Sequence, residues 1–171
     1  NITKYIIAQR KIDHKFHMSD ISKKAITICE KTIKYKSSIF KSGKWLKPWK
    51  NKKFDLIISD ISSINDFVAK NSPWYKGISC NAGEDGLRNI KEILKKIKTN
   101  LEKNGTFILP IISLSNEKKL LMILNKYFRT VSYTKKIDWP LPNFFIKKIL
   151  FYEELKKKGH INYINKFGVK I

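Results

Sequence analysis

The sequence has few cysteines, few arginines and no long apolar run, and each shortage excludes a class of protein. Its two cysteines, Cys29 and Cys80, stand far apart without CxxC spacing, so neither a structural zinc site nor a disulfide framework is expected. No stretch approaches the roughly 18 apolar residues that a membrane-spanning helix requires. We therefore expect a protein of the reducing cytoplasm with no metal and no membrane partner.

Acidic residues are also scarce. The chain has 36 Lys and Arg against 14 Asp and Glu, a net charge of +22. A basic surface neutralises phosphates and releases their counterions, which favours a nucleic-acid partner. Yet only three of these residues are arginines, the side chain that pairs bidentately with bases and phosphates. A functional basic face and a general lysine bias both stay open.

The length fits one domain. At 171 residues, with 42% hydrophobic and 12% aromatic side chains, the chain can bury one core, and we expect residues 1–171 to form a single domain. It begins at Asn1 rather than Met, and residues 168–171 resemble a strand that is just starting. We therefore expect the sequence to be part of a longer chain.

Strand and helix patterns alternate along the sequence. The predicted strands are residues 15–20, 37–40, 54–59, 106–114 and 131–135; the predicted helices are residues 3–11, 22–33, 87–101, 116–128 and 144–157. A helical turn is expected at residues 66–70 and a long loop at residues 71–85. Alternation with short connections predicts an α/β fold, a mostly parallel sheet with helices on both faces. Ligands of such sheets bind at the carboxyl ends of the strands.

Two of these strands have distinctive features. The apolar run at residues 54–59 (FDLIIS) is typical of a strand that is buried on both faces. Pro110 falls inside the strand predicted at residues 106–114, where it indicates a bulge or an edge. Ser115 is expected to cap the following helix.

Three motifs follow one another over some seventy residues. The first is a strand that ends in Asp20 before a helix (residues 18–25, MSDISKKA); this carboxylate can accept two hydroxyl protons, or it can cap the helix. The second is residues 53–62 (KFDLIISDIS). The third is residues 82–90 (AGEDGLRNI), in which Gly83 and Gly86 permit left-handed backbone and Asp85 is expected to cap a helix that starts near Leu87.

In this order the motifs resemble class I S-adenosylmethionine-dependent methyltransferases, near the release-factor glutamine and ribosomal RNA guanine N-methyltransferases. The resemblance implies a Rossmann-like sheet. It also implies that Asp20 binds the ribose hydroxyls of the cofactor and that Ile21 lies against the adenine. Ser42 and Gly43 occupy the place where the family contacts the adenine amine, although a simple loop is the alternative.

The resemblance also assigns the catalytic end of the site. Ser59 and Asp60 would lie beside the transferred methyl group, with Ile61 on the substrate side. Where those relatives have Asn-Pro-Pro-Tyr this chain has Ser-Asp-Ile-Ser, a departure that argues against methylation of a planar amine. From the following loop, Trp74 and Tyr75 would stack on the substrate; a packing role is the alternative for Trp74.

The first strand of the implied sheet and the cofactor-cradling glycine loop after it are not in the sequence, and the last strand is expected to be incomplete. In nucleotide-binding units the acidic residue follows that loop by about 20 residues, so the loop is expected just before Asn1. The helix at residues 3–11 would then face the cofactor with its N-terminus. On this interpretation residues 1–171 alone bind the cofactor weakly or not at all.

The expected function is methyl transfer from S-adenosylmethionine to an unidentified acceptor, with RNA or a ribosomal component as the expected partner. Two alternatives remain: a catalytically silent, basic RNA-binding module on the same scaffold, and a methyltransferase that acts on small molecules or proteins. The histidines at positions 14, 17 and 160 show no ligand spacing, and no G-x-S-x-G elbow is present, which argues against a metal site and a hydrolase.

Overall fold

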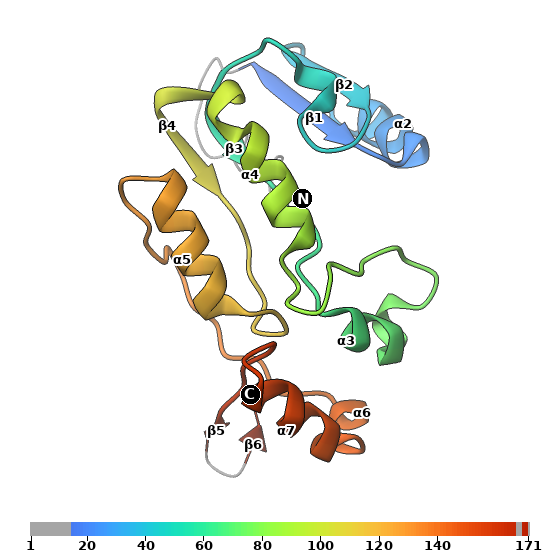
Figure 1. Cartoon of the computed structure of the whole chain (residues 1–171). Coiled ribbons are helices and arrows are strands. Elements are labelled where there is room, and N and C mark those ends of the chain that lie inside the picture. The colour runs from blue at the N-terminus through green and yellow to red at the C-terminus, as the bar shows by residue number, and fades with distance from the viewer. Residues whose placement is uncertain (1–14, 167–168, 171) are drawn as a thin grey trace. The chain divides into compact units, whose positions relative to one another are not determined.

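The computed structural model describes residues 15–166 and 169–170 (Figure 1). The helix predicted at residues 3–11 and the histidine at position 14 lie outside the described residues. The chain divides into two compact units, Asn1–Phe54 and Asp55–Ile171. Each unit combines helices with short two-stranded sheets. A mixed α/β class is therefore confirmed at this coarse level, while one continuous sheet is not observed among the described strands.

The first unit is built from a strand, a helix and a second strand. Its elements are β1 (Phe16–Asp20), α2 (Lys23–Thr32), β2 (Ser38–Ser42) and a short 3-10 helix, η1 (Lys47–Trp49). The two strands run parallel, which requires the crossover that α2 supplies. The hydroxyl of Ser22 accepts a hydrogen bond from the Ala25 amide at 3.2 Å and caps α2. The predictions for this region are confirmed in element type and order.

Aromatic side chains hold the first unit together. His17 lies edge-on to the rings of Trp49 and Phe54, at centroid distances of 5.0 and 5.2 Å. The Trp49 indole N–H donates to the Ser19 hydroxyl at 3.0 Å, which fixes η1 to β1. Burial, and then the nearby charge of Lys52, lower the pKa of His17. The neutral imidazole is therefore the favoured form in this setting.

The second unit contains most of the helices. The elements in chain order are β3 (Phe54–Ile58), whose first residue belongs to the first unit, α3 (Asp66–Asn71), η2 (Pro73–Tyr75), α4 (Arg88–Asn100), β4 (Leu101–Ile108), α5 (Glu117–Tyr127), α6 (Asn143–Ile146), α7 (Ile149–Lys157), β5 (Asn165–Lys166) and β6 (Val169–Lys170). Strand β3 pairs with β4, and β5 pairs antiparallel with β6. The helical turn and the helices predicted near residues 66, 87 and 116 are confirmed.

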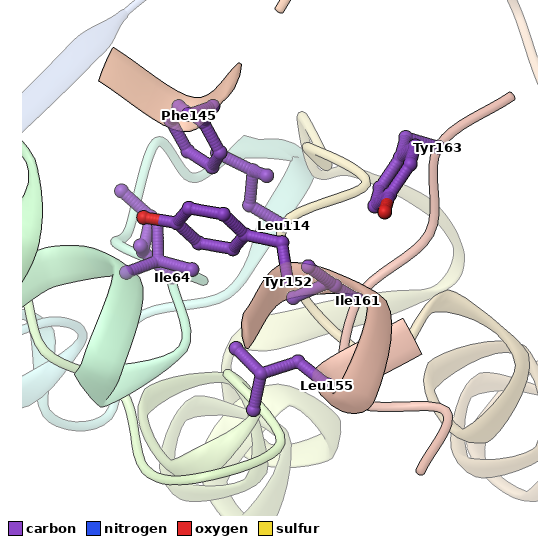
Figure 2. Close-up of a cluster of buried hydrophobic side chains, with 8 residues drawn as sticks. Ile64, Leu114, Phe145, Tyr152, Leu155, Ile161 and Tyr163 are labelled. Carbon is purple, nitrogen blue, oxygen red and sulfur yellow. The ribbon is translucent and has the colours of Figure 1, made fainter. Parts of the chain in front are cut away.

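Two sets of apolar side chains form the core of this unit. Figure 2 shows the first, in which Phe145 and Tyr152 lie beside Ile64 and Leu114. The rings of Phe145 and Tyr152 stack with their centroids 4.4 Å apart. The second is the apolar stripe of α4, whose members at i, i+3, i+4 and i+7 are buried: Ile90, Ile93, Leu94 and Ile97. Burying an aliphatic side chain of this size contributes about 1.5 to 3 kcal/mol. The apolar residues whose helical spacing predicted α4 are therefore the residues that the helix buries in the core.

The strand predicted at residues 106–114 is displaced. Strand β4 begins at Leu101 and ends at Ile108, so it includes Asn104 and Gly105, and Pro110 lies beyond its end. Proline has no amide proton to donate to a ladder, which explains the early end. Pairing with β3 outweighs the turn preference of Asn104 and Gly105 at the other end. The cap of α5 also differs, because the Asn116 side chain supplies it instead of Ser115.

Three further predictions need correction. Residues 131–135 form no strand in the described structure and are mostly exposed, because β-propensity without packing does not hold a strand. The helix predicted at residues 144–157 is divided into α6 and α7, with a break at residues 147–148. In β3 only Ile57 is buried, while Leu56 and Ile58 are 47% and 42% exposed, so this strand is not covered on both faces.

Candidate functional site

Asp20 lies at the carboxyl end of β1 with its side chain exposed. One carboxylate oxygen accepts a hydrogen bond from the Ser22 amide at 2.7 Å. Because Ser22 caps α2, the aspartate shapes the turn before the helix without being the cap. This turn holds the carboxylate at the strand end, where it faces solvent.

The end of β2 lies beside the end of β1. In the parallel register Asp20 stands opposite Ser42, and the Gly43 amide donates to the Asp20 carbonyl at 2.9 Å. A Cβ on Gly43 would lie 2.5 Å from the Pro48 ring, so this position has no room for a side chain. Ile21, the residue after Asp20, has a side chain that is 70% exposed. We call these four residues, Asp20, Ile21, Ser42 and Gly43, the β1–β2 edge.

The predicted catalytic residues belong to the second unit. Ser59 is buried, and its amide donates to the Ile108 carbonyl at 3.0 Å, whereas Asp60 is exposed and Ile61 is half-buried. The Ser62 hydroxyl donates to the Cys80 carbonyl, and the Asn89 amide group donates to the Ser62 carbonyl at 3.2 Å. The segment after β3 is therefore fixed at Ser59 and at Ser62, before and after Asp60 in the sequence.

The two aromatic residues of the long loop lie in different surroundings. Trp74 is 52% exposed and meets the Phe144 ring edge-on at 5.4 Å. Tyr75 packs against the core cluster of Figure 2, and burial raises the pKa of its hydroxyl. Of the pair, Trp74 is thus the ring that solvent reaches, and Tyr75 serves packing. Both lie on η2, a short 3-10 helix within the predicted loop.

The glycines of the third motif have the backbone that the sequence predicts. Gly83 and Gly86 have φ of +89° and +70°. A Cβ on Gly86 would lie 2.6 Å from the Ser115 Cβ and 3.0 Å from the Ser63 carbonyl oxygen, so the backbone segments meet closely here. Asp85 is not the cap of α4: it accepts from the Leu87 amide at 3.0 Å, and the helix begins at Arg88. The left-handed backbone expected at Gly83 and Gly86 is confirmed, and the cap expected from Asp85 is wrong.

Sequence reasoning missed the ion pairs of Asp85. The ammonium groups of Lys91, on α4, and Lys119, on α5, both lie 2.8 Å from one carboxylate oxygen. Burial alone would raise the pKa of Asp85, but hydrogen bonds from Lys119, Lys91 and the Leu87 amide outweigh it and lower the pKa to about 2. No short-range pattern links Asp85 to Lys119, because the two are 34 positions apart. The carboxylate joins two helices and is a structural centre.

The described residues show no group of three His, Cys, Asp or Glu side chains that could hold a metal ion. They also include no helix that is long and apolar enough to cross a membrane. The chain matches no protein-family model, no curated protein and no solved structure. The case for a function therefore depends on the chain's own residues, of which the β1–β2 edge belongs to the first unit and Ser59, Asp60, Ile61, Trp74 and Tyr75 to the second.

Proposed function

We propose that this protein transfers a methyl group from S-adenosylmethionine and that Asp20 binds the ribose of the cofactor. The observation that carries the proposal is an exposed carboxylate at the carboxyl end of the first of two parallel strands joined by a helix. Ligands of open α/β sheets bind outside this end. The finer fold, a Rossmann-like sheet, is part of the same proposal.

The β1–β2 edge offers suitable chemistry for an adenosine. A carboxylate has about four acceptor sites, so the bond from the Ser22 amide leaves capacity for two ribose hydroxyls. The exposed side chain of Ile21 supplies an apolar surface for the adenine. The Ser42 hydroxyl, opposite Asp20, can bond a ring nitrogen or the exocyclic amine.

Methyl transfer asks little covalent chemistry of the protein. The acceptor's lone pair forms a bond to the methyl carbon as the carbon–sulfur bond breaks, and the electron pair stays on sulfur. Asp60 is exposed and can take the proton that the acceptor loses. Most of the acceleration then comes from holding the acceptor in line with the sulfonium. RNA or a ribosomal component is the acceptor class that we propose.

Calorimetric titration of S-adenosylmethionine into the full-length natural protein tests the proposal. In Asp20→Asn the amide oxygen can still accept from Ser22, so the turn is retained while the charge is lost. Two charge-assisted hydrogen bonds at about 1.5 to 3 kcal/mol each predict at least a tenfold weaker affinity. The matched control is Glu30→Gln, which changes the other carboxylate of residues 15–54 and should leave the affinity unchanged. Absence of cofactor affinity, or equal affinity in Asp20→Asn, would exclude the proposal.

A second candidate has its own supporting observation. The first unit has a dense lysine surface, so a basic binding module without methyl transfer is the alternative function. Nucleic-acid affinity in a protein that binds no S-adenosylmethionine would favour it.

A further inference from the structure

Positive charge is concentrated in the first unit. Residues 15–54 contain twelve lysines, two carboxylates and no arginine, and all twelve lysines are exposed. The 110 residues from 55 to 164 contain 19 basic and 11 acidic side chains. The excess of positive charge is therefore ten over the 40 residues 15–54 and eight over the 110 residues 55–164. Two carboxylates are too few to neutralise twelve ammonium groups.

Five of these lysines recur at every third position. They form what we call the lysine row: Lys41, Lys44, Lys47, Lys50 and Lys53. The apolar side chains of Leu46 and Trp49, also three positions apart, are buried. Hydrogen bonds from the amides of residues 47, 49 and 52 to the carbonyls three positions earlier, at 3.0 to 3.1 Å, turn the chain between them. Within this turn Leu46 and Trp49 are buried while Lys44, Lys47 and Lys50 are exposed, and Lys41 and Lys53 on either side are exposed as well.

The backbone that carries the row is fixed in place. The Lys41 ammonium lies 5.0 Å from the centre of the Trp49 ring and 3.4 Å from the Pro48 carbonyl oxygen. The Lys44 ammonium lies 4.3 Å from the centre of the Trp45 ring. The indole of Trp49 is bonded to Ser19 on β1. The row is therefore presented by an ordered loop, which lowers the entropy lost on binding.

We propose that the lysine row binds the phosphate backbone of a nucleic acid, independently of base sequence. Lysine contacts phosphates as a point charge, whereas bidentate readout of bases uses arginine, which residues 15–54 lack. No exposed ring is available in the row for stacking, because Trp49 is buried and Trp45 is half-buried below Lys44. The contacts are thus electrostatic. This binding goes beyond the proposed methyl transfer and does not depend on it.

An anionic membrane fits the same loop less well. Peripheral membrane segments combine basic residues with apolar side chains that enter the bilayer. In the loop of the lysine row the apolar side chains face inward: Leu46 and Trp49 are buried, and Trp45 and Pro48 are half-buried. The loop therefore offers charge without an apolar anchor, which favours a polyanion in solution.

Two variants with equal net charge test the proposal. The row variant carries Lys→Gln substitutions at 44, 47, 50 and 53, and it keeps Lys41 because of the Pro48 contact. The matched control carries Lys→Gln substitutions at 96, 103, 118 and 126, which are exposed lysines of the second unit. Circular dichroism checks that both variants are folded. The probe is a fluorescent single-stranded RNA of mixed sequence, whose affinity is measured by anisotropy over a range of salt concentrations.

The row variant should lose at least about tenfold in RNA affinity at low salt, and its log–log salt slope should fall by about 3, since each phosphate contact on a single strand contributes roughly 0.7. The control should stay within about twofold of the native protein, as electrostatic effects at a distance are screened. An RNA of another sequence should bind equally well.

Equal losses in the two variants would overturn the proposal, because they would make the charge a general property of the chain. So would row-dependent binding to phosphatidylserine vesicles without RNA binding. RNA affinity that survives Asp20→Asn supports the surface even where cofactor binding fails, so the two proposals fail separately.

Discussion

The two units use their lysines in different ways. In the second unit one carboxylate draws two lysines into fixed contacts: Asp85 binds Lys91 and Lys119 and thereby joins α4 to α5. Over residues 15–54 of the first unit twelve lysines share two carboxylates, and the lysine row lies outside a loop that aromatic side chains hold in place. The same residue type therefore stabilises the fold in one unit and forms a charged surface in the other.

The difference shows what net charge alone cannot. The net charge of +22 does not show where along the chain the charge lies. The net positive charge per residue is about three times higher over residues 15–54 than over residues 55–164. A compositional bias toward lysine would raise the lysine content of both units alike. Lysines are about twice as frequent over residues 15–54 (12 of 40) as over residues 55–164 (17 of 110), and carboxylates are half as frequent (2 of 40 against 11 of 110), so both distributions separate the two regions.

The largest expected loss of stability comes from a substitution at Gly86, where backbone segments meet closely beside Asp85. Gly86→Ala would place a Cβ 2.6 Å from the Ser115 Cβ at a positive φ. Overpacking and left-handed strain together predict a loss of about 3 kcal/mol or more in the free energy of unfolding. Gly77→Ala is the control, since Gly77 also has a positive φ but a Cβ there would meet no atom within 4 Å. This variant should lose about 1 to 2 kcal/mol in the free energy of unfolding. Equal urea midpoints for the two variants would contradict the close packing.

Removing the Asp85 charge should have a smaller effect. Asp85→Asn leaves Lys91 and Lys119 without their carboxylate, and the loss of hydrogen bonds between charged groups predicts a decrease of about 1 to 3 kcal/mol in unfolding free energy. Lys95→Gln breaks the exposed pair with Glu92, and we expect it to cost less than about 0.5 kcal/mol. Chemical denaturation of both variants measures the difference. A Lys95→Gln loss as large as that of Asp85→Asn would remove the distinction between structural and surface pairs.

Acid should weaken the ion pairs of Asp85 with Lys91 and Lys119. The pKa of Asp85 is lowered to about 2 in the folded protein, below its unfolded value near 3.9. A group with a depressed folded pKa contributes stability above the unfolded pKa and loses it as pH falls through the folded pKa. We therefore expect a loss on the order of 1 to 2 kcal/mol between about pH 4 and pH 2. Urea unfolding of native protein and Asp85→Asn at several pH values would show it, as their difference should shrink toward pH 2.

The smallest expected effect on stability is that of the lysine row. Lys→Gln at 44, 47, 50 and 53 removes exposed charges that lie near like charges. The lost contact of Lys44 with the Trp45 ring is worth about 0.5 to 1 kcal/mol at an exposed site, and relief of repulsion offsets part of it. The unfolding free energy should stay within about 1 kcal/mol of the native value. A larger loss, seen as a lower urea midpoint, would make the row a structural feature like the Asp85 pairs.

Periodicity located the elements that bury a regular stripe. Helices α4 and α2 follow directly from local sequence, although Ser22 caps α2 instead of Asp20. The predictions of strands at residues 106–114 and 131–135 were wrong. A strand depends on the partner with which it pairs, and a local stretch of sequence does not contain that partner. For the candidate site, the exposed Asp20 at a strand end and the left-handed Gly83 and Gly86 could be predicted. The partners of Asp85 could not, since they come from two different helices.

The most direct measurement is a thermodynamic cycle on Asp20. Calorimetry would give the affinities of native full-length protein and Asp20→Asn for S-adenosylmethionine and for its 2′,3′-dideoxyribose analogue. If the carboxylate binds the ribose hydroxyls, native protein should bind the analogue at least about tenfold more weakly, while Asp20→Asn should distinguish the two ligands much less. Equal discrimination in native protein and Asp20→Asn would contradict the account.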